Sequence, residues 1–417
     1  LIQRRRQYIS LFTVCTISVC IIISLLSICG GMLKALNAKA VQYYGGELQV
    51  WCGNRFGLDN AEEISRTLNK HLLNMNIKSQ INKRFDFDGT FTEFYYEGSN
   101  TYCRVLKGID FIAEKDLLSK MTLISGNIEN VTPGSILISF PVAQKLGCNA
   151  GDKITVMVKT LNEYINTTDF VVAGIFQDSS LFGMYTSYID IDSLRSITGY
   201  PEEYYNRIGI FTPKKSLSNK ELNSLQELIS KDFNFAPIPE NKEKYIVESW
   251  QDPNTSYALI TLDANRPEVV MMSNALRLIV YLIIIPLVLI VAIGISCSYR
   301  VVILKRIVET STFRALGLKA RGVEKLFFTE VLMILLVGFI VGTGISFAVT
   351  AIIGHFNFSF IPAFDLFLIG GRIKADYSFW KIIFVLFIIA FSTLTGVFVT
   401  LRNIIRLSPA KAFATTV

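Results

Sequence analysis

The sequence predicts a polytopic α-helical membrane protein with four transmembrane helices and a large mixed α/β domain, outside the membrane, between the first helix and the second. Three observations support this prediction. Four long apolar stretches carry no charge, lysine and arginine gather in particular segments, and residues 34–277 have the mixed composition of a soluble domain. The chain has 417 residues, of which 51% are hydrophobic, and the four stretches account for the excess.

The charge-free stretches are long enough to cross a membrane. Asp, Glu, Lys and Arg are absent between residues 6 and 34, 277 and 300, 330 and 365, and 381 and 402. About 20 helical residues cross a hydrocarbon core of about 30 Å, and one charge at the centre costs roughly 2.5–3.5 kcal/mol. Buried core helices of a soluble protein are the alternative, which four such windows disfavour. We expect spans at 8–33, 278–298, 331–353 and 382–401.

The positions of the basic residues predict the orientation. Three precede the first span, seven lie within residues 299–325, and three follow the last span, whereas these segments hold only Glu309 and Glu324 as acids. Cytoplasmic segments are rich in Lys and Arg. Both termini and residues 299–325 should therefore lie on the cytoplasmic side of the membrane, with residues 34–277 and the loop 354–381 outside. The net charge of +7 then reflects topology, and no nucleic acid partner is needed.

The outer segment reads as alternating helices and strands. Apolar periodicity predicts a helix at 59–75, and Ser218 with Glu221 forms the capping box of a helix at 218–232. A two-turn helix should end at Gly147, and a strand at 101–107 should end in a turn at Gly108. Further strands are expected in "SILISF", "KITVMV", "DFVVAGIF" and "YTSYIDI". These elements predict one mixed α/β domain.

No residue pattern in this domain predicts catalysis or a metal site. The chain has two histidines, and His71 lies among apolar neighbours on a predicted helix, where a structural role is expected. Asp190 and Asp192 fit the end of a strand and the cap of the next helix better than a metal site. No nucleotide-binding or nucleophile motif is present. We therefore expect no catalytic residue and no bound metal.

Three cysteines lie in the outer segment: Cys52, Cys103 and Cys148. An odd number permits at most one disulfide, and free buried thiols are the alternative.

The two spans that flank the outer domain should continue beyond the membrane. "MLKALNAKAVQYY" follows the first span, "PEVVMMSNALR" precedes the second, and both are compatible with helix. We expect a stalk built from these two helices. The alternative is that Lys34 and Lys39 are ordinary juxtamembrane residues that reach toward the interface. The predicted organisation is an N-terminal end and span at 1–40, an outer domain at 41–265, and a C-terminal domain with three spans at 266–417.

A basic segment joins the second and third spans. As a helix, "ETSTFRALGLKARGVEKLFFTE" at 309–330 would turn its apolar residues toward the membrane or the spans and its basic residues toward water. The apolar residues are Val308, Phe313, Leu316 and Leu318, and the basic ones are Arg314, Lys319, Arg321 and Lys325. The alternative is that this segment is a membrane-surface helix without a protein partner.

This segment resembles the E-I-G-x-L-R-A-L-G signature of MacB/FtsX-type ABC transporter permeases. "ETSTFRALG" at 309–317 matches at five positions, while Thr310 and Ser311 replace the usual Ile-Gly. Glu330 matches the acid that opens the third span in the family. "RLSPAKAF" at 406–413 is similar to the closing motif, and "GSILISFPVAQKLGCNAGDKITV" with "DFVVAGIF" is similar to the outer core.

The resemblance implies a permease that does no chemistry and binds no cofactor of its own. ATP would be bound by a cytoplasmic ABC ATPase dimer, which is a separate chain or precedes Leu1, because no phosphate-binding loop is present. The ATPase would grip the coupling loop within 299–325, and Gly317 would end its helix in a left-handed conformation. The implied coupling residues are Glu309, Phe313, Arg314, Ala315, Leu316, Gly317, Lys319 and Arg321. A second permease, the same chain or a paralogue, would complete the assembly, and the stalks would transmit movement outward.

Three glycines in the third predicted span form a small-x-x-x-small pattern: Gly338, Gly342 and Gly344. Such a pattern lets another helix approach closely. Packing within the chain and contact with a second subunit are both open.

The cargo is predicted from a finer resemblance. "GIFQDSSLFGMY" and "VESWQDPNTS" are similar to Lol-type lipoprotein-releasing permeases, which lift lipoproteins from the inner membrane toward the outer membrane and pass them to a periplasmic carrier. The connection from Lys159 to Asp169 is shorter than in that group. The alternatives are MacB-like efflux of peptides or antibiotics, and FtsX-like activation of an outer partner without transport. Membrane lipid or lipoprotein is the expected ligand.

Overall fold

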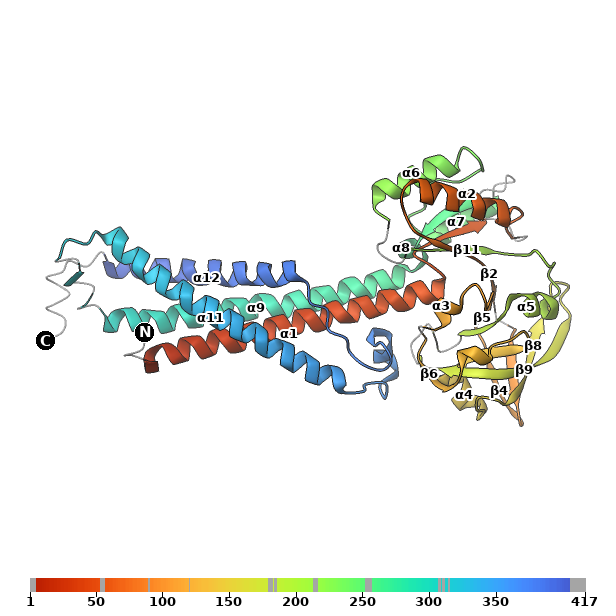
Figure 1. The fold of residues 1–417 in the computed structure, drawn as a ribbon, viewed down its shortest axis with the longest axis horizontal. Helices are drawn as coiled ribbons and strands as arrows, with labels where there is room; N and C mark the ends of the chain where they lie inside the picture. The colour runs from red at the N-terminus through yellow and green to blue at the C-terminus, as the bar shows by residue number, and fades with distance from the viewer. Residues whose placement is uncertain are drawn as a thin grey trace. The chain divides into compact units, whose positions relative to one another are not determined.

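The computed structural model describes residues 5–52, 57–88, 91–119, 121–178, 183, 186–212, 217–251, 257–306, 309, 312–313 and 316–405 (Figure 1). The chain divides into two compact units, which we describe separately. The helical unit comprises residues up to Leu33, Ser273–Phe356, and the residues from Ile373 onward. The α/β unit comprises Lys34–Met272 together with the short segment Asn357–Arg372.

Four long helices contain the predicted spans. They are α1 (Arg5–Tyr44), α9 (Pro267–Lys305), α11 (Ala320–His355) and α12 (Phe379–Ile405). Each holds a stretch long and apolar enough to cross a membrane. The first lies near the N-terminus, and the α/β unit is inserted between it and the second, so the predicted fold class is confirmed.

The helical unit is apolar on its outside as well as in its core. Ile22 and Ile295 are fully buried at the helix contacts, whereas Leu282, Ile290 and Phe391 are each more than 60% exposed. In a soluble bundle the outward face would be polar, and a helix that is apolar all round fits a hydrocarbon environment. The composition of both faces therefore supports a multi-pass membrane protein.

Two of these helices extend past their predicted spans. Helix α1 continues without a break to Tyr44, and α9 already begins at Pro267. The expected helical continuation of the first and second spans is therefore present. Both extensions belong to the α/β unit, which starts at Lys34 and includes α9 up to Met272.

The described part of the α/β unit holds one twelve-stranded sheet. The strands are β1 (Leu48–Cys52), β2 (Gln80–Asp88), β3 (Glu93–Tyr96), β4 (Ser99–Tyr102), β5 (Val105–Ile109), β6 (Leu123–Gly126), β7 (Ser135–Ser139), β8 (Lys153–Lys159), β9 (Ile165–Phe176), β10 (Thr186–Asp190), β11 (Arg207–Phe211) and β12 (Tyr257–Thr261). Their order is β12-β1-β11-β2-β5-β10-β7-β9-β8-β3-β4, with β6 paired to β9. Two pairs, β5 with β10 and β7 with β9, are parallel, so the sheet is mixed.

Short helices cover the sheet, and the two largest hydrophobic cores of the unit lie beneath four of them. The helices are α2 (Ala61–Asn74), α3 (Lys115–Leu118), α4 (Phe140–Leu146), α5 (Ile191–Thr198), α6 (Asn219–Ile229), α7 (Lys242–Gln251) and α8 (Leu262–Asn265), with 3-10 turns η2 (Ile128–Asn130) and η3 (Pro362–Phe367). One core lies under α2 and α6, where Ile64, Leu68 and Leu225 are fully buried. The other lies under α4 and α5.

Most local predictions for this unit are confirmed. The capping box of Ser218 and Glu221 opens α6, Asp190 caps α5, and Gly147 ends α4 with a φ of +76°. The strand predicted at 101–107 is wrong, because β4 ends at Tyr102 and β5 begins at Val105. The expected turn at Gly108 is wrong as well, since this glycine lies inside β5.

A close helix contact explains why a glycine stands in the middle of β5. A Cβ at Gly108 would lie 2.8 Å from the side chain of Leu194, so α5 packs directly over this point of the strand. Glycine in a strand is typical where another element approaches closely. The three outer cysteines are buried and form no disulfide within the described residues, and burial raises the pKa of Cys103 to about 12.

Candidate functional site

The segment between α9 and α11 ends in a tight turn at Gly317. Thr312 and Phe313 have helical backbone geometry, the N–H of Leu316 donates to the carbonyl of Thr312 at 3.0 Å, and the N–H of Leu318 donates to that of Phe313 at 3.0 Å. Gly317 has a φ of +93°. This bond across six residues and the left-handed glycine are the marks of a Schellman helix end. The predicted left-handed conformation of Gly317 is therefore present.

The turn leaves apolar and basic side chains exposed. Leu316 is 80% exposed, Phe313 is 41% exposed and Leu318 is 42% exposed. Lys319 and Arg321, the first basic residues after the turn, are also exposed. We call these five residues the coupling surface. We expected Leu316 to face the membrane or the spans. It does not pack against the spans, because 80% of its surface is exposed, and its position toward the membrane stays a prediction.

The remaining predicted coupling residues are placed only in part. Arg314 and Ala315 lie outside the described residues, as does Val308. Glu309 is described and has helical geometry. Glu309 is not part of the coupling surface, because its carboxylate faces the end of α9.

An ion cluster holds this segment to both neighbouring helices. The Nε of Arg306 donates to Glu309 Oε2 at 2.9 Å, and its Nη1 donates to Glu330 Oε2 at 2.7 Å. The hydroxyl of Tyr299 donates to the carbonyl of Phe327 at 3.2 Å and lies 3.4 Å from Glu330 Oε2. The Arg306 guanidinium also lies 5.2 Å from the centre of the Phe327 ring. We call these five residues the Arg306 cluster.

The Arg306 cluster joins α9, the coupling segment and α11 at one place. Its side chains are partly exposed: 18% for Arg306, 40% for Glu309 and 16% for Glu330. Sequence reasoning counted Arg306 only as one basic residue among seven. The three-residue spacing of Arg306 and Glu309 could have revealed their pair. The pair with Glu330 needs the folding of α11 against α9, and no local pattern shows it.

Two of the three predicted packing glycines lie against α1. A Cβ at Gly342 would lie 2.6 Å from the backbone oxygen of Thr16, and one at Gly338 would lie 3.0 Å from the sulfur of Cys15. Both contacts are within the chain. A Cβ at Gly344 would meet nothing within 4 Å, so this glycine packs against no other helix among the described residues.

Sequence reasoning missed a tighter helix contact. A Cβ at Gly396 on α12 would lie 2.0 Å from the hydroxyl of Ser296 on α9. Ser392 and Thr400 stand four positions before and after Gly396, so the small-x-x-x-small spacing that marks such a contact was present in the sequence.

Within the α/β unit, the ends of α1 and α9 are joined by polar and apolar contacts. The Nη2 of Arg266, just before α9, donates to Asn37 Oδ1 on α1 at 2.7 Å. Leu36 and Val269 share a small buried cluster. Lys39 is only 13% exposed and pairs with two carboxylates, so the alternative that it reaches toward the membrane interface is wrong.

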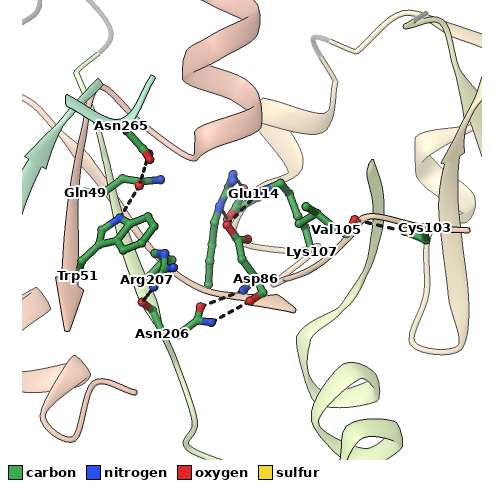
Figure 2. A network of polar contacts seen from close by, with 11 residues as sticks. Gln49, Trp51, Asp86, Cys103, Val105, Lys107, Glu114, Asn206, Arg207 and Asn265 are labelled. Carbon is green, nitrogen blue, oxygen red and sulfur yellow. Dashed lines mark hydrogen bonds and ion pairs between the residues drawn. The ribbon is translucent and has the colours of Figure 1, made fainter. Parts of the chain in front are cut away.

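A buried polar network occupies the centre of the sheet (Figure 2). Arg84 forms an ion pair with Glu114, and Lys107 donates to Asp86 at 2.9 Å. Although burial acts to raise it, the pKa of Asp86 is lowered, with Lys107 as the largest cause of the lowering. Three of these charges lie on the neighbouring strands β2 and β5, and Glu114 lies between β5 and α3. The charges neutralise one another, which indicates a structural network.

Arg207 borders the same network without an ion pair to a carboxylate in Figure 2. Its guanidinium lies 3.2 Å from the centre of the Trp51 ring, and its Nη1 donates to the carbonyl of Asn206. Burial lowers the pKa of Arg207 to about 10. Asn206 exchanges two hydrogen bonds with the backbone of Asp86, which fixes β11 against β2. The arrangement stabilises the sheet and offers no reacting group.

Comparison with known proteins supports the predicted family. Residues 281–409 match the family model described as FtsX-like permease C-terminal. This part of the chain is an FtsX-like permease domain. It includes most of α9, all of α11 and α12, the coupling surface and the Arg306 cluster. The match supports the FtsX-type part of the predicted family for this domain, in a chain with four helices long and apolar enough to cross a membrane.

Solved structures give weaker likenesses. The periplasmic region of MacB from Actinobacillus actinomycetemcomitans is 13% identical, with a TM-score of 0.32 over 54% of this chain and 92% of that one. A domain of a protein assigned as a permease from Porphyromonas gingivalis is 12% identical, with a TM-score of 0.29 over 51% and 86%. TM-scores this low establish neither fold nor function. No curated protein sequence matches the chain.

Proposed function

We propose that the chain is the transmembrane permease subunit of an ABC transporter in a bacterial inner membrane, driven by a separate ATPase dimer that grips the coupling surface. The observation that carries this proposal is the 80% exposure of Leu316 beside exposed basic residues. An apolar side chain held outward by a rigid turn favours a partner that covers it. Lys319 and Arg321 would meet an acidic groove through charge-assisted hydrogen bonds.

The Arg306 cluster supports a mechanical role for this surface. Its contacts tie the coupling segment to α9 and α11, so a force applied to the segment reaches two spans at once. Helices α1 and α9 then continue unbroken from the helical unit into the α/β unit. ATP binding by the partner would favour one packing of the spans over another, and the continuous helices would carry the change outward.

We further propose that the cargo is a lipoprotein, released from the inner membrane toward the outer membrane. The similarity of residues 174–185 and 247–256 to Lol-type permeases supports this cargo. The hairpin between β8 and β9 is short, running from Lys159 to Ile165. A periplasmic carrier would therefore bind another part of the α/β unit. A second permease, the same chain or a paralogue, would enclose the cargo.

Reconstitution tests the proposal. The permease and its ATPase are placed in vesicles with a triacylated model lipoprotein, and ATP-dependent release is measured. A matched arm uses the same polypeptide without its acyl chains. We expect release and faster ATP hydrolysis with the acylated form alone. Equal stimulation by the unacylated peptide would favour MacB-like efflux. Stimulation by neither form, with activation of an outer partner on ATP addition, would favour an FtsX-like transmitter and contradict transport.

A further inference from the structure

We propose that Lys39 is a positioning residue that locks the loop between α11 and α12, residues 357–372, onto α1 and the end of β9. The loop then moves as part of the α/β unit. The role of the lock in a transport cycle rests on the proposed function, whereas the lock itself depends only on contacts within the α/β unit.

The geometry brings together three segments that are far apart in the sequence. The Nζ of Lys39 on α1 donates to the backbone oxygen of Asp365 in η3 at 2.6 Å and lies 3.5 Å from its Oδ2. It also lies 3.4 Å from Oδ1 of Asp178, just after β9. The side chains are 13%, 1% and 5% exposed respectively. One ammonium thus serves two buried carboxylates, and we call the three residues the Lys39 cluster.

Burial makes this arrangement hard to rearrange. A carboxylate taken out of water needs a charged or hydrogen-bonded partner, and removing one member of a buried pair leaves the other uncompensated. Lys39 contacts both the backbone and the side chain of Asp365. It therefore holds η3 in position and also neutralises the Asp365 carboxylate. The loop cannot leave α1 without exposing these groups or losing their partner.

Apolar contacts hold the same loop from a second side. Leu366 is 3% exposed and shares a cluster with Leu36 of α1 and Val269 of α9. Leu368 is fully buried. Within the loop, the N–H of Phe358 donates to the carbonyl of Gly371 at 2.8 Å, which closes it into a compact turn. The loop is therefore an ordered piece, and the Lys39 cluster determines where it docks.

The lock adds two connections between the spans and the α/β unit. One end of the loop follows α11, which ends at His355, and the other leads to α12, which begins at Phe379. With the lock closed, movement of α11 and α12 reaches the α/β unit through the loop, in addition to the paths along α1 and α9. The Lys39 cluster thus lets the loop connect α11 and α12 to the α/β unit, as the stalk connects α1 and α9.

A distance measurement tests the lock in the full-length permease without any cargo. Spin labels replace Phe360 in the loop and Leu73 on α2, which are 76% and 59% exposed, in a background carrying Cys20→Ala and Cys297→Ala. We expect one narrow distance in nanodiscs, unchanged when the ATPase and ATP are added. Lys39→Met should broaden the distribution about twofold. An equally narrow distribution in Lys39→Met would overturn the proposal.

A neutralised variant separates positioning from simple stability. Lys39→Met, Asp178→Leu and Asp365→Leu together replace every charge of the cluster by an apolar side chain, and such replacements often leave stability nearly unchanged. We expect near-normal melting with a distribution that stays broad. If the narrow distance returns, packing alone positions the loop and the proposal is wrong. Lys244→Met, which breaks an ion pair that is 77% and 66% exposed, is the matched control and should change nothing.

The same variants test the role in the cycle. With ATPase and the triacylated lipoprotein present, lipoprotein released per ATP should fall about tenfold in the neutralised variant, a size typical of coupling between sites. Unchanged release would overturn the transmission role. If the unaltered permease releases no lipoprotein, the proposed function fails instead, and the distance measurement still decides whether the lock exists.

Discussion

The Arg306 cluster and the Lys39 cluster share one arrangement of charges and differ in their exposure. Each places one cation between two carboxylates from different segments. In the helical unit, Arg306 bridges Glu309 and Glu330 with side chains 16–40% exposed. In the α/β unit, Lys39 bridges Asp178 and Asp365 with side chains 1–13% exposed. Partial exposure leaves water as an alternative partner for the three charged groups of the first cluster, whereas the charged groups of the second have little access to water.

This difference in burial suits the two clusters to different structural roles. Ion pairs near water are screened and contribute little net stability, so they form and break at low cost. Buried pairs contribute specificity of position, and breaking them is expensive. The Arg306 cluster is therefore suited to a segment that must respond when a motor protein pushes on it. The Lys39 cluster is suited to a joint that must not yield.

The largest expected effect comes from breaking the buried cluster. Lys39→Met should reduce the free energy of unfolding by about 3–5 kcal/mol, because it withdraws the ammonium from two buried carboxylates. Denaturant unfolding of the permease in detergent, followed by tryptophan fluorescence, measures the change. Lys244→Met should remain within about 0.5 kcal/mol of the unaltered chain. An equal loss of unfolding free energy in the two variants would show that burial does not distinguish the two ion pairs.

The second-largest expected loss of stability comes from breaking an uncharged contact between two helices. Gly342→Ala should cost about 1–3 kcal/mol, because the new Cβ would lie 2.6 Å from the backbone oxygen of Thr16 and α1 would have to shift. Gly344→Ala adds the same methyl group where nothing lies within 4 Å. Melting of both variants in detergent checks the prediction. Equal melting temperatures for the two variants would contradict the predicted close contact between Gly342 and α1.

The exposed cluster should give a smaller loss of stability. Arg306→Gln removes two charge-assisted hydrogen bonds, but partial exposure reduces their net contribution to about 1 kcal/mol. The melting temperature should fall only slightly, while stimulation of the ATPase by the permease should fall strongly, since the coupling segment loses its attachment to α11. A variant that melts early and still stimulates the ATPase fully would reverse the roles given to the two clusters.

Much of this could be predicted from the sequence, because the signals are local. Charge-free windows revealed the spans, and the capping residues Ser218 and Gly147 marked helix ends correctly, since each acts within a few residues. The left-handed turn at Gly317 followed from the same kind of local chemistry. These features need no knowledge of what lies across the fold.

The two clusters could not be predicted, because their partners are distant in the chain. Lys39 looked like a juxtamembrane lysine, and Asp365 only marked the end of an apolar window. Their pairing spans 326 positions and exists only after the loop folds back onto α1. The strand at 101–107 failed for a related reason, since the break between Tyr102 and Val105 is set by pairing with different neighbours, β3 for one strand and β2 with β10 for the other.

The smallest expected effect concerns salt. A double-mutant cycle of Arg306→Gln with Glu330→Gln should give a coupling energy that falls by a few tenths of a kcal/mol between about 0.05 and 0.5 M NaCl, because screening shortens the reach of exposed charges. The corresponding cycle of Lys39→Met with Asp365→Asn should not change. Equal salt dependence in the two cycles would show that burial does not separate them.

The central claim, that a separate ATPase grips the coupling surface, is tested most directly by copurification in detergent. Leu316→Ser and Arg314→Glu are compared with Leu161→Ser, which alters a leucine of the outer hairpin that is 52% exposed. Loss of one buried apolar anchor costs about 1–3 kcal/mol, so we expect roughly tenfold or greater loss of ATPase capture for Leu316→Ser with unchanged melting of the permease alone. Arg314→Glu should behave in the same way, and Leu161→Ser should capture normally. Full capture and full ATPase stimulation in both coupling-segment variants would contradict the claim, and would place the motor's attachment elsewhere on the permease.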